Sequence, residues 1–290
     1  MDSMREILDT ARTENKPIWQ VVLEADLEER ETTAEASFEK MRMTWRAMLE
    51  SVEDYQGDRR SLSGLVGGDG QRMRDYAAAG DALCGPYLQK VIATALCVGE
   101  SNACMRRIVA APTAGACGVL PAVLVPLYQA ERAEEDELVR ALYVSAGIGA
   151  VIGFRASIAG ASGGCQAEIG SASGMAAGAL TALRGGSGEQ IGHAVAMALK
   201  NLMGLVCDPI AGLVEVPCVK RNVIGAVNAV SCADMALAGV TSRVPADEVI
   251  DCMGDVGRRL PVELRETALG GLAATPFGKS VKERMEQGES

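Results

Sequence analysis

The sequence predicts an all-α protein in which helices alternate with glycine-rich loops. Aromatic residues make up only 3% of the 290 residues and 33 residues are glycine, so the core must be built from small and aliphatic side chains. This composition favours closely packed helices over a β-sandwich, whose strands are rich in aromatic and β-branched residues. No segment alternates polar and apolar residues as a half-buried strand does. An α/β fold is the second choice.

Residues 1–60 form the first predicted unit, a charged and amphipathic helical segment. Thr32-Thr33-Ala34-Glu35 has the spacing of a capping box, which marks the start of a helix. The apolar residues that follow recur at helical intervals and should pack in the core: Phe38, Met41, Trp45, Met48 and Val52. Residues 61–70 break this periodicity and are expected to form a loop beside a cleft. The chain is therefore divided into 1–60 and 61–290, which should fold as one continuous unit.

In residues 61–290, helical stretches are separated by loops rich in glycine or marked by proline, at 111–118, 160–174, 185–188 and 205–222. The most apolar stretch, Ala141–Phe154, has 14 residues. A helix needs roughly 18 to 20 apolar residues to cross a bilayer. We therefore expect a buried helix here and no membrane interaction.

The net charge and the cysteine content indicate which partners and which cellular environment to expect. A net charge of −10 argues against nucleic acid as a partner, because phosphate binding needs clustered lysine and arginine. The first ten residues are acidic and periodic, unlike a secretory signal. Nine cysteines without such a signal indicate free thiols in a reducing, cytoplasmic environment.

Two cysteines lie in the last of the four loops. Cys207 comes two residues before Pro209, and Cys218 directly follows Pro217. Proline disfavours helix for the residue before it, so both thiols should lie at helix breaks, where they can point at a shared object. Cys165 lies 42 positions before Cys207, within a Gly-Gly-Cys-Gln sequence.

Three thiolates from separate loops could hold three irons of a cubane iron–sulfur cluster and leave the fourth iron open as a Lewis acid. Spacing alone does not decide between this site and buried core thiols, since free cysteines are often buried and no C-x-x-C pair is present. The other six should be packing residues, with Cys117 as the next ligand candidate: Cys84, Cys97, Cys104, Cys117, Cys232 and Cys252.

Two of the glycine-rich loops could bind an anion. Each precedes an apolar helical run and offers backbone N–H groups together with serine or threonine hydroxyls. Neither loop matches a nucleotide-binding motif, so a small carboxylate is the better ligand. The candidate substrate-binding residues are Thr113, Ala114, Gly115, Ser162, Gly163, Gly164 and Gln166.

A general base is harder to find in this sequence. His193 is the single histidine and falls on a predicted helix, where a structural role is the more common one. Lys200, seven residues later, has an unperturbed pKa of about 10.4 and would need strong desolvation to act as a base. Both remain weak candidates, and the base is expected to come from elsewhere.

Four stretches resemble the α chain family of iron–sulfur-dependent L-serine dehydratases: APTAGACGVLPAVL (111–124), ASIAGASGGCQAEIGSASGMAAGAL (156–180), NLMGLVCDPIAGLVEVPCVKRN (201–222) and LRETALGGLAATPFGK (264–279). The resemblance covers nearly the whole chain. It implies that 61–290 is a mostly helical catalytic domain with a 4Fe–4S cluster on Cys165, Cys207 and Cys218. It also implies that L-serine loses water at the open iron and becomes pyruvate and ammonia, without pyridoxal phosphate.

The resemblance further implies a partner subunit. The family's candidate base is a histidine in another domain, which in two-subunit enzymes is a separate β chain, so we expect a heteromer. Some single-chain relatives have a histidine where this chain has Lys200, and some carry a C-terminal cysteine that the tail after Phe277 lacks. The α chain alone is expected to self-associate through a face around 61–70 and 111–118.

Two alternatives stay open at this point. A related iron–sulfur lyase could release sulfide from L-cysteine, because no residue in these loops can be assigned to selecting a hydroxyl over a thiol. A non-catalytic iron–sulfur binding subunit is the second alternative. The Thr113 loop argues against it, since such a subunit needs no carboxylate site.

Overall fold

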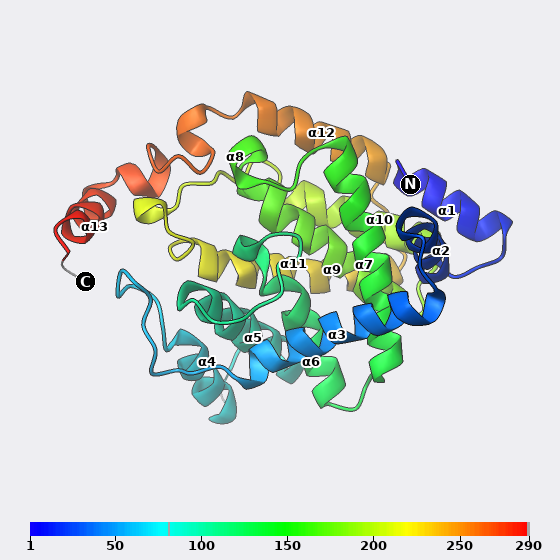
Figure 1. The fold of residues 1–290 in the computed structure, drawn as a ribbon, viewed down its shortest axis with the longest axis horizontal. Coiled ribbons are helices and arrows are strands. Elements are labelled where there is room, and N and C mark those ends of the chain that lie inside the picture. Colours follow the sequence, from blue (N-terminus) through cyan, green and yellow to red (C-terminus); the bar gives the residue numbers. More distant parts are fainter. Residues whose placement is uncertain (81, 289–290) are drawn as a thin grey trace.

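The computed structural model describes residues 1–80 and 82–288, which contain thirteen α-helices and no strand (Figure 1). The prediction of an all-α fold is confirmed. The helices are α1 Met4–Thr13, α2 Ile18–Arg30, α3 Ala34–Glu53, α4 Asp69–Ala78, α5 Pro86–Ala103, α6 Val119–Gln129, α7 Glu135–Arg155, α8 Gly160–Gly163, α9 Ser171–Leu183, α10 Gly188–Asn201, α11 Cys218–Leu237, α12 Ala246–Arg259 and α13 Pro276–Glu286.

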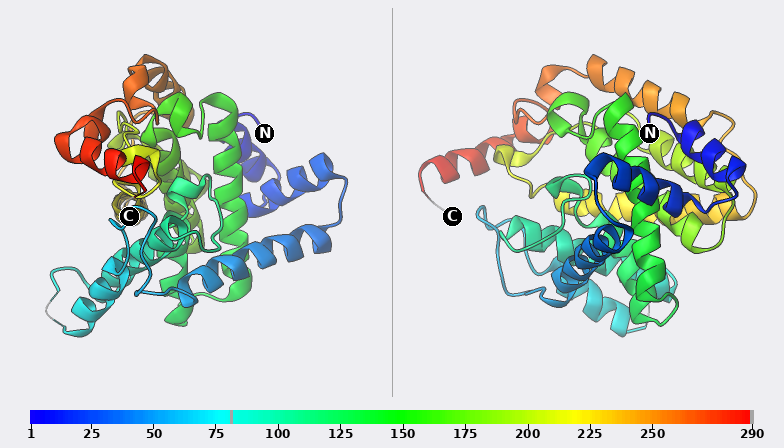
Figure 2. Two further views of the ribbon diagram at one scale, coloured as in Figure 1. Left: turned by 60° about the vertical axis from the view of Figure 1, so that its left-hand side comes forward. Right: turned by 45° about the vertical axis from the view of Figure 1, so that its right-hand side comes forward.

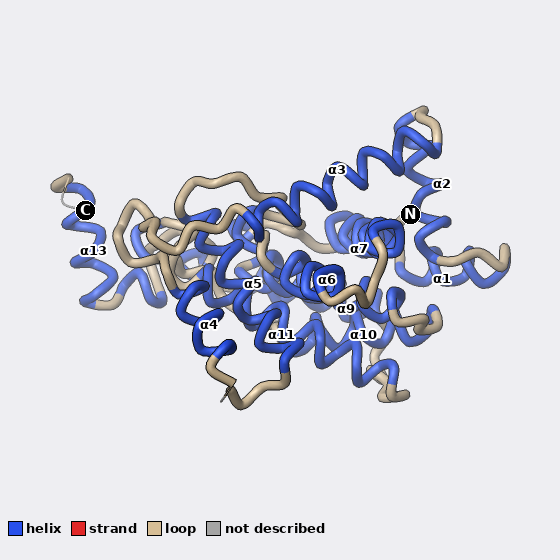
Figure 3. Tube along the Cα trace, turned by 90° about the horizontal axis from the view of Figure 1, so that it is seen from below, coloured by secondary structure: helices blue, strands red, loops and turns tan. Residues whose placement is uncertain are grey.

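Helices α1 and α2 lie at one end of the molecule and α13 at the other, while α3 runs from the first end towards the middle (Figure 3). Figure 2 shows the α2–α3 connection projecting from the body. Helix α3 starts one residue later than the predicted capping box, because Thr33 is the N-cap and its hydroxyl accepts a hydrogen bond from the Ala36 N–H at 3.3 Å. Trp45, Met48 and Val52 are buried on its inner face.

Helix α9 forms the centre of the core and contacts α6, α7, α10 and α11. Its sequence, SASGMAAGALTAL, consists mainly of small residues, and nearly all of them are buried. The close approach of α7 depends on glycine: a Cβ atom at Gly178 would collide with the Cδ1 atom of Ile148. Small residues thus replace aromatic ones as the means of filling this core.

The apolar stretch predicted as a buried helix is the second half of α7. By length and composition α7 is the one helix in the described residues that could cross a membrane, and 61% of its apolar window is buried inside the fold. It packs against α2, α3 and α9, so it is a core helix of this fold.

After α12 the chain turns back across the cysteine-bearing loops. The Cys207 N–H donates to the Leu264 carbonyl, and the Glu266 N–H donates to the Cys207 carbonyl, both at 2.8 Å. This forms an isolated parallel bridge between Cys207 and Arg265. Figure 3 shows loops gathered between α13 and the helix ends near α4 and α5. The C-terminal segment therefore forms one wall around Cys207.

Candidate functional site

The three cysteines singled out by the sequence each lie at a break in the helical structure. Cys165 directly precedes the π-helix η2, Gln166–Gly170, which continues into α9. Cys207 lies in the bridge to the C-terminal segment, and Cys218 is the first residue of α11. All three are free thiols with at most 8% of their surface exposed. The predicted helix breaks are confirmed.

The thiols lie close enough to influence one another's ionisation. Burial raises the pKa of Cys207, and negative charge on Cys165 or Cys218 raises it further. Burial likewise raises the pKa of Cys165 to about 11, against the opposing effect of the Arg221 guanidinium. The pKa of Cys218 rises to about 12, chiefly through burial. The structure thus brings the three predicted thiols together, in a place where thiolate charge needs compensation.

Arg221 is a basic residue close enough to lower the pKa values of Cys165 and Cys218. Its guanidinium donates to the Asp208 carboxylate at 2.8 Å and to the Val206 carbonyl at 2.7 Å. Asp208 in turn accepts from the Leu272 N–H at 2.9 Å. The ion pair therefore joins α11, the Cys207 loop and the C-terminal segment, since each contributes one partner.

Glu168, on the π-helix, was missed by the sequence reasoning. One carboxylate oxygen accepts from the Thr113 hydroxyl at 2.7 Å, and the other lies 4.0 Å from the Cys207 sulfur. Burial raises the pKa of this carboxyl, and nearby Glu266 raises it further, while the bond from Thr113 lowers it. Its signal in the sequence was an acidic residue inside an otherwise uncharged cysteine loop, and π-helical turns are frequent at functional sites.

The Thr113 loop lies against α11. The Gly118 N–H donates to the Asn222 side-chain oxygen, and the Asn222 amide donates back to the Gly115 carbonyl, both at 2.8 Å. Within the described chain, the N–H groups of Ala114 and Gly115 have no acceptor. Buried backbone N–H groups rarely lack one, and Gly115 is buried. This loop can therefore accept an anionic group.

The other predicted substrate-binding residues hold the cysteine loop in place. The Gln166 amide donates to the Met253 carbonyl at 3.0 Å and accepts from the Gly204 N–H at 2.8 Å. A Cβ atom at Gly164, whose φ is +74°, would lie 2.6 Å from Leu260. Gly163 packs against Gly257 of α12. These three residues have positioning roles.

Ser162 is exposed and forms a hydrogen bond of 2.6 Å with the Ser157 hydroxyl. Ala114, in the Thr113 loop, is also exposed.

A second buried carboxylate anchors the loop after α3. Glu215 is 5% exposed and accepts hydrogen bonds from the Ser61 hydroxyl at 2.6 Å and from the Ser63 hydroxyl. The Ser63 N–H donates to it at 3.5 Å. The predicted loop at 61–70 is thereby tied to the segment between Cys207 and Cys218.

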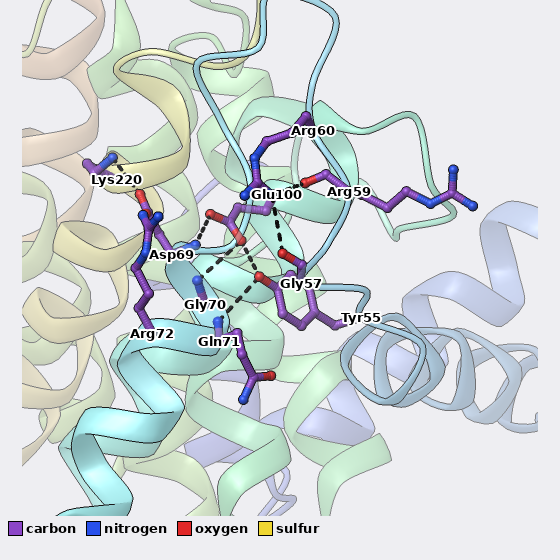
Figure 4. Close-up of polar contacts among 10 residues, drawn as sticks. All are labelled: Tyr55, Gly57, Arg59, Arg60, Asp69, Gly70, Gln71, Arg72, Glu100 and Lys220. Atoms are coloured by element: carbon purple, nitrogen blue, oxygen red, sulfur yellow. Dashed lines mark hydrogen bonds and ion pairs between the residues drawn. The ribbon is translucent and has the colours of Figure 1, made fainter.

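The start of α11 is braced from the other side by the network in Figure 4. Lys220 forms an ion pair of 3.0 Å with Asp69 at the start of α4. The buried Glu100 carboxylate accepts from the N–H groups of Asp69 at 2.8 Å and Gly70 at 3.2 Å, and from the Tyr55 hydroxyl. A carboxylate in this position satisfies the free N–H groups at the start of a helix. Helices α4, α5 and α11 are thus held together beside Cys218.

The chain is similar to known proteins over most of its length. Residues 13–273 match the family model described as "Serine dehydratase alpha chain". The chain belongs to this family. It is 44% identical over 283 residues to the "Probable L-serine dehydratase, alpha chain" of Bacillus subtilis (strain 168), covering 98% of this chain and 94% of that protein. It is 42% identical over 284 residues to the "L-serine dehydratase, alpha chain" of Peptoniphilus asaccharolyticus, covering 97% of each.

Some other relatives of this chain are longer. The "L-serine dehydratase" of Streptomyces coelicolor is 46% identical over 181 residues, which are 62% of this chain and 40% of that protein. The matched part of the alpha chain thus corresponds to less than half of that relative.

The two candidate bases of this alpha chain do not join the cysteines. Lys200 donates to the Ser242 carbonyl at 2.7 Å, and His193 accepts from the Ser242 N–H at 3.4 Å. His193 lines a cavity of about 920 Å³ formed with α1 and α2, whose lining contains no cysteine. Both side chains therefore support the turn after α11.

The prediction that the other six cysteines are packing residues is only partly correct. Cys97, Cys117 and Cys232 are buried, and Cys84 and Cys104 are half-buried. Cys252 is exposed, because it lies on the outer face of α12, so for this residue the prediction was wrong.

Proposed function

We propose that this chain is the catalytic α subunit of an L-serine dehydratase, which removes water from L-serine and yields pyruvate and ammonia. One observation carries the proposal: three buried thiols from three separate loops meet beside Glu168 and the unpaired amides of Ala114 and Gly115. Family membership and the names of the relatives support the same substrate.

The residues at the site fit a 4Fe–4S cluster. In the described part of the chain, no three His, Cys, Asp or Glu side chains lie close enough to hold a single metal ion. A cluster makes a different demand, because each thiolate binds a different iron. Three buried thiols that lie close enough to affect one another's ionisation suit that demand, and metal binding would release their protons. Cys165, Cys207 and Cys218 would hold the cluster and leave one iron without a cysteine of this chain.

When bound, the cluster supplies a Lewis acid that makes the hydroxyl of L-serine a better leaving group. The chain's own residues bind and orient the substrate. The Ala114 and Gly115 amides hold its carboxylate, and Thr113 fixes Glu168 beside it. Loss of the Cα proton and of hydroxide gives aminoacrylate, which tautomerises to an imine and hydrolyses to pyruvate and ammonia.

The general base is proposed to come from a β chain, in a cytoplasmic heteromer. A base must come within about 3 Å of the Cα proton. His193 and Lys200 are engaged with Ser242, away from the cysteines. Histidine is the residue best suited to this task near neutral pH, so a histidine of the partner is the candidate.

The experiment is anaerobic reconstitution of the α chain with iron and sulfide, followed by addition of the β chain and L-serine. Cys165→Ser, Cys207→Ser and Cys218→Ser should each lose iron and turnover, while Cys252→Ser should keep both. A full cluster in Cys207→Ser would refute the ligand set and make Cys117 the next candidate.

Two further outcomes of this experiment would change the proposal. Sulfide release from L-cysteine in excess of pyruvate from L-serine would identify a desulfidase. Full turnover without the β chain, abolished by His193→Ala, would place the base in this chain. An iron-loaded complex without activity on either amino acid would favour a non-catalytic subunit.

A further inference from the structure

We propose that Glu168 binds the α-ammonium group of the substrate and so selects amino acids over hydroxy acids. This inference rests on the proposed function, because it names a contact within the same site. Glu168 lies three residues after Cys165, and its carboxylate lies 4.0 Å from the Cys207 sulfur and 2.7 Å from the Thr113 hydroxyl.

The Glu168 carboxylate has unused capacity to accept hydrogen bonds. A carboxylate offers about four lone-pair positions, yet only the Thr113 hydroxyl donates to this one within a normal distance. Among the residues that the structure describes, no lysine or arginine pairs with Glu168 or Glu266. Arg221, which lies near Cys165, is engaged by Asp208 and Val206. A half-buried carboxylate without a neighbouring cation costs free energy, and a bound cationic ligand would remove that cost.

A second carboxylate reaches the same point. A Cβ atom at Gly160 would lie 2.7 Å from an oxygen of Glu168, 3.0 Å from one of Glu266 and 3.2 Å from the Cys207 sulfur. These three atoms therefore lie close together against Gly160, whose lack of a side chain lets them approach. An ammonium group has three N–H donors and needs several acceptors. Two carboxylate oxygens around one point meet that need.

The substrate carboxylate, which carries the opposite charge, has its own binding groups next to these carboxylates. A Cβ atom at Gly115 would lie 3.2 Å from the second oxygen of Glu168, and the Gly115 and Ala114 N–H groups lack acceptors within the chain. The two ends of a zwitterionic amino acid thus find complementary groups on adjoining residues. A 2-hydroxy acid would satisfy the amides and leave both carboxylates uncompensated.

The test compares two ligands on the assembled, iron-loaded αβ enzyme. Glu168→Gln should raise the KM for L-serine about 10- to 100-fold, the loss expected for a charge-assisted hydrogen bond. The inhibition constant of 3-hydroxypropanoate, which has the carboxylate and hydroxyl but no ammonium, should stay within about twofold. Glu283→Gln, on the exposed face of α13, removes the same charge elsewhere and should change neither value.

Iron content is measured on every variant. If Glu168→Gln loses iron, Gly160→Ala is tested instead. Its methyl group displaces the Glu168 carboxylate without removing it. This variant should also raise the KM for L-serine and leave the inhibition constant of 3-hydroxypropanoate unchanged. An unchanged KM for L-serine, or equal loss of both ligands, would overturn the role of Glu168. Absence of serine turnover in the unmodified αβ enzyme would instead overturn the proposed function.

Discussion

Burial raises the pKa of each of the three cysteines at the site. Cys165 and Cys218 lie where burial raises their pKa values to about 11 and 12, from an ordinary value near 9. At neutral pH the metal-free chain therefore carries protonated thiols at the site. Cys252, exposed on α12, lies outside this environment.

These pKa values predict how the stability of the metal-free chain depends on pH. Above pH 9 the unfolded chain releases thiol protons that the folded chain still holds, so stability falls as pH rises from 9 towards 11 or 12. The fall is at most about 1.4 kcal/mol per thiol and pH unit. Urea unfolding under anaerobic reducing conditions measures it. The Cys165→Ser/Cys218→Ser variant should show a shallower decline, and an identical decline would contradict this prediction.

At the scale of the elements, the site is where several buried helices begin. The π-helix before α9 follows Cys165, α11 starts at Cys218, and α6 starts just after the Thr113 loop. Helix N-termini carry partial positive charge, which favours bound anions. The small residues of α9 let the neighbouring helices pack closely against it, and this brings the helix starts near one another.

A methyl group added between α7 and α9 should disturb this packing. Gly178→Ala should destabilise the protein by about 1–3 kcal/mol, because the new Cβ meets the Ile148 Cδ1 atom. Ile148→Val removes that atom and should restore part of the loss. Thermal unfolding of both single variants and the double variant measures the coupling. Strictly additive losses would contradict the proposed collision.

The loop anchored by Glu215 gives a prediction at the same scale. Glu215→Ala leaves the Ser61 and Ser63 hydroxyls without their buried acceptor and should cost about 1.5–3 kcal/mol. The released loop should be cleaved faster in limited proteolysis around 61–66. Glu53→Ala, at the exposed end of α3, serves as the matched control. Equal cleavage rates in the two variants would show that Glu215 does not anchor the loop.

At the scale of the whole molecule, some of the exposed apolar side chains lie on two segments that are bonded to the Cys207–Cys218 loop. Leu62, Leu269 and Phe277 are 67%, 64% and 57% exposed. The first lies on the loop tied to Glu215, and the others lie on the C-terminal segment tied to Asp208. Exposed apolar patches commonly mark interaction surfaces.

We expect the isolated α chain to self-associate through this face and the β chain to replace that contact. Leu62→Ser/Leu269→Ser should shift the α chain towards monomer in sedimentation velocity and weaken β binding at least about tenfold. Leu83→Ser, at a fully exposed position on the α4–α5 connection, is the control. Unchanged sedimentation of the double variant would exclude this face.

The sequence predicted the parts of this molecule that depend on local pattern. Helix periodicity identified Trp45 and Met48 as core residues, and proline positions placed Cys207 and Cys218 at helix breaks. The sequence did not predict the contacts between segments that lie far apart along the chain. Glu168 gains its importance from Thr113, 55 positions away, and the bridge to Cys207 comes from a segment without a regular pattern.

That bridge has a consequence for when the protein can mature during its synthesis. All three proposed ligand cysteines leave the ribosome before Leu264 and Glu266, which hold the backbone of Cys207 on both sides. A nascent chain whose last residues are still in the exit tunnel lacks this wall of the site, so iron uptake should wait for release. Arrested ribosomes test this: a chain stalled at residue 290 should take up little iron. The same chain, moved out of the tunnel by a long flexible C-terminal extension, should take up its full iron content. Equal iron content in the two arrested chains would show that the cysteines bind iron without the C-terminal segment.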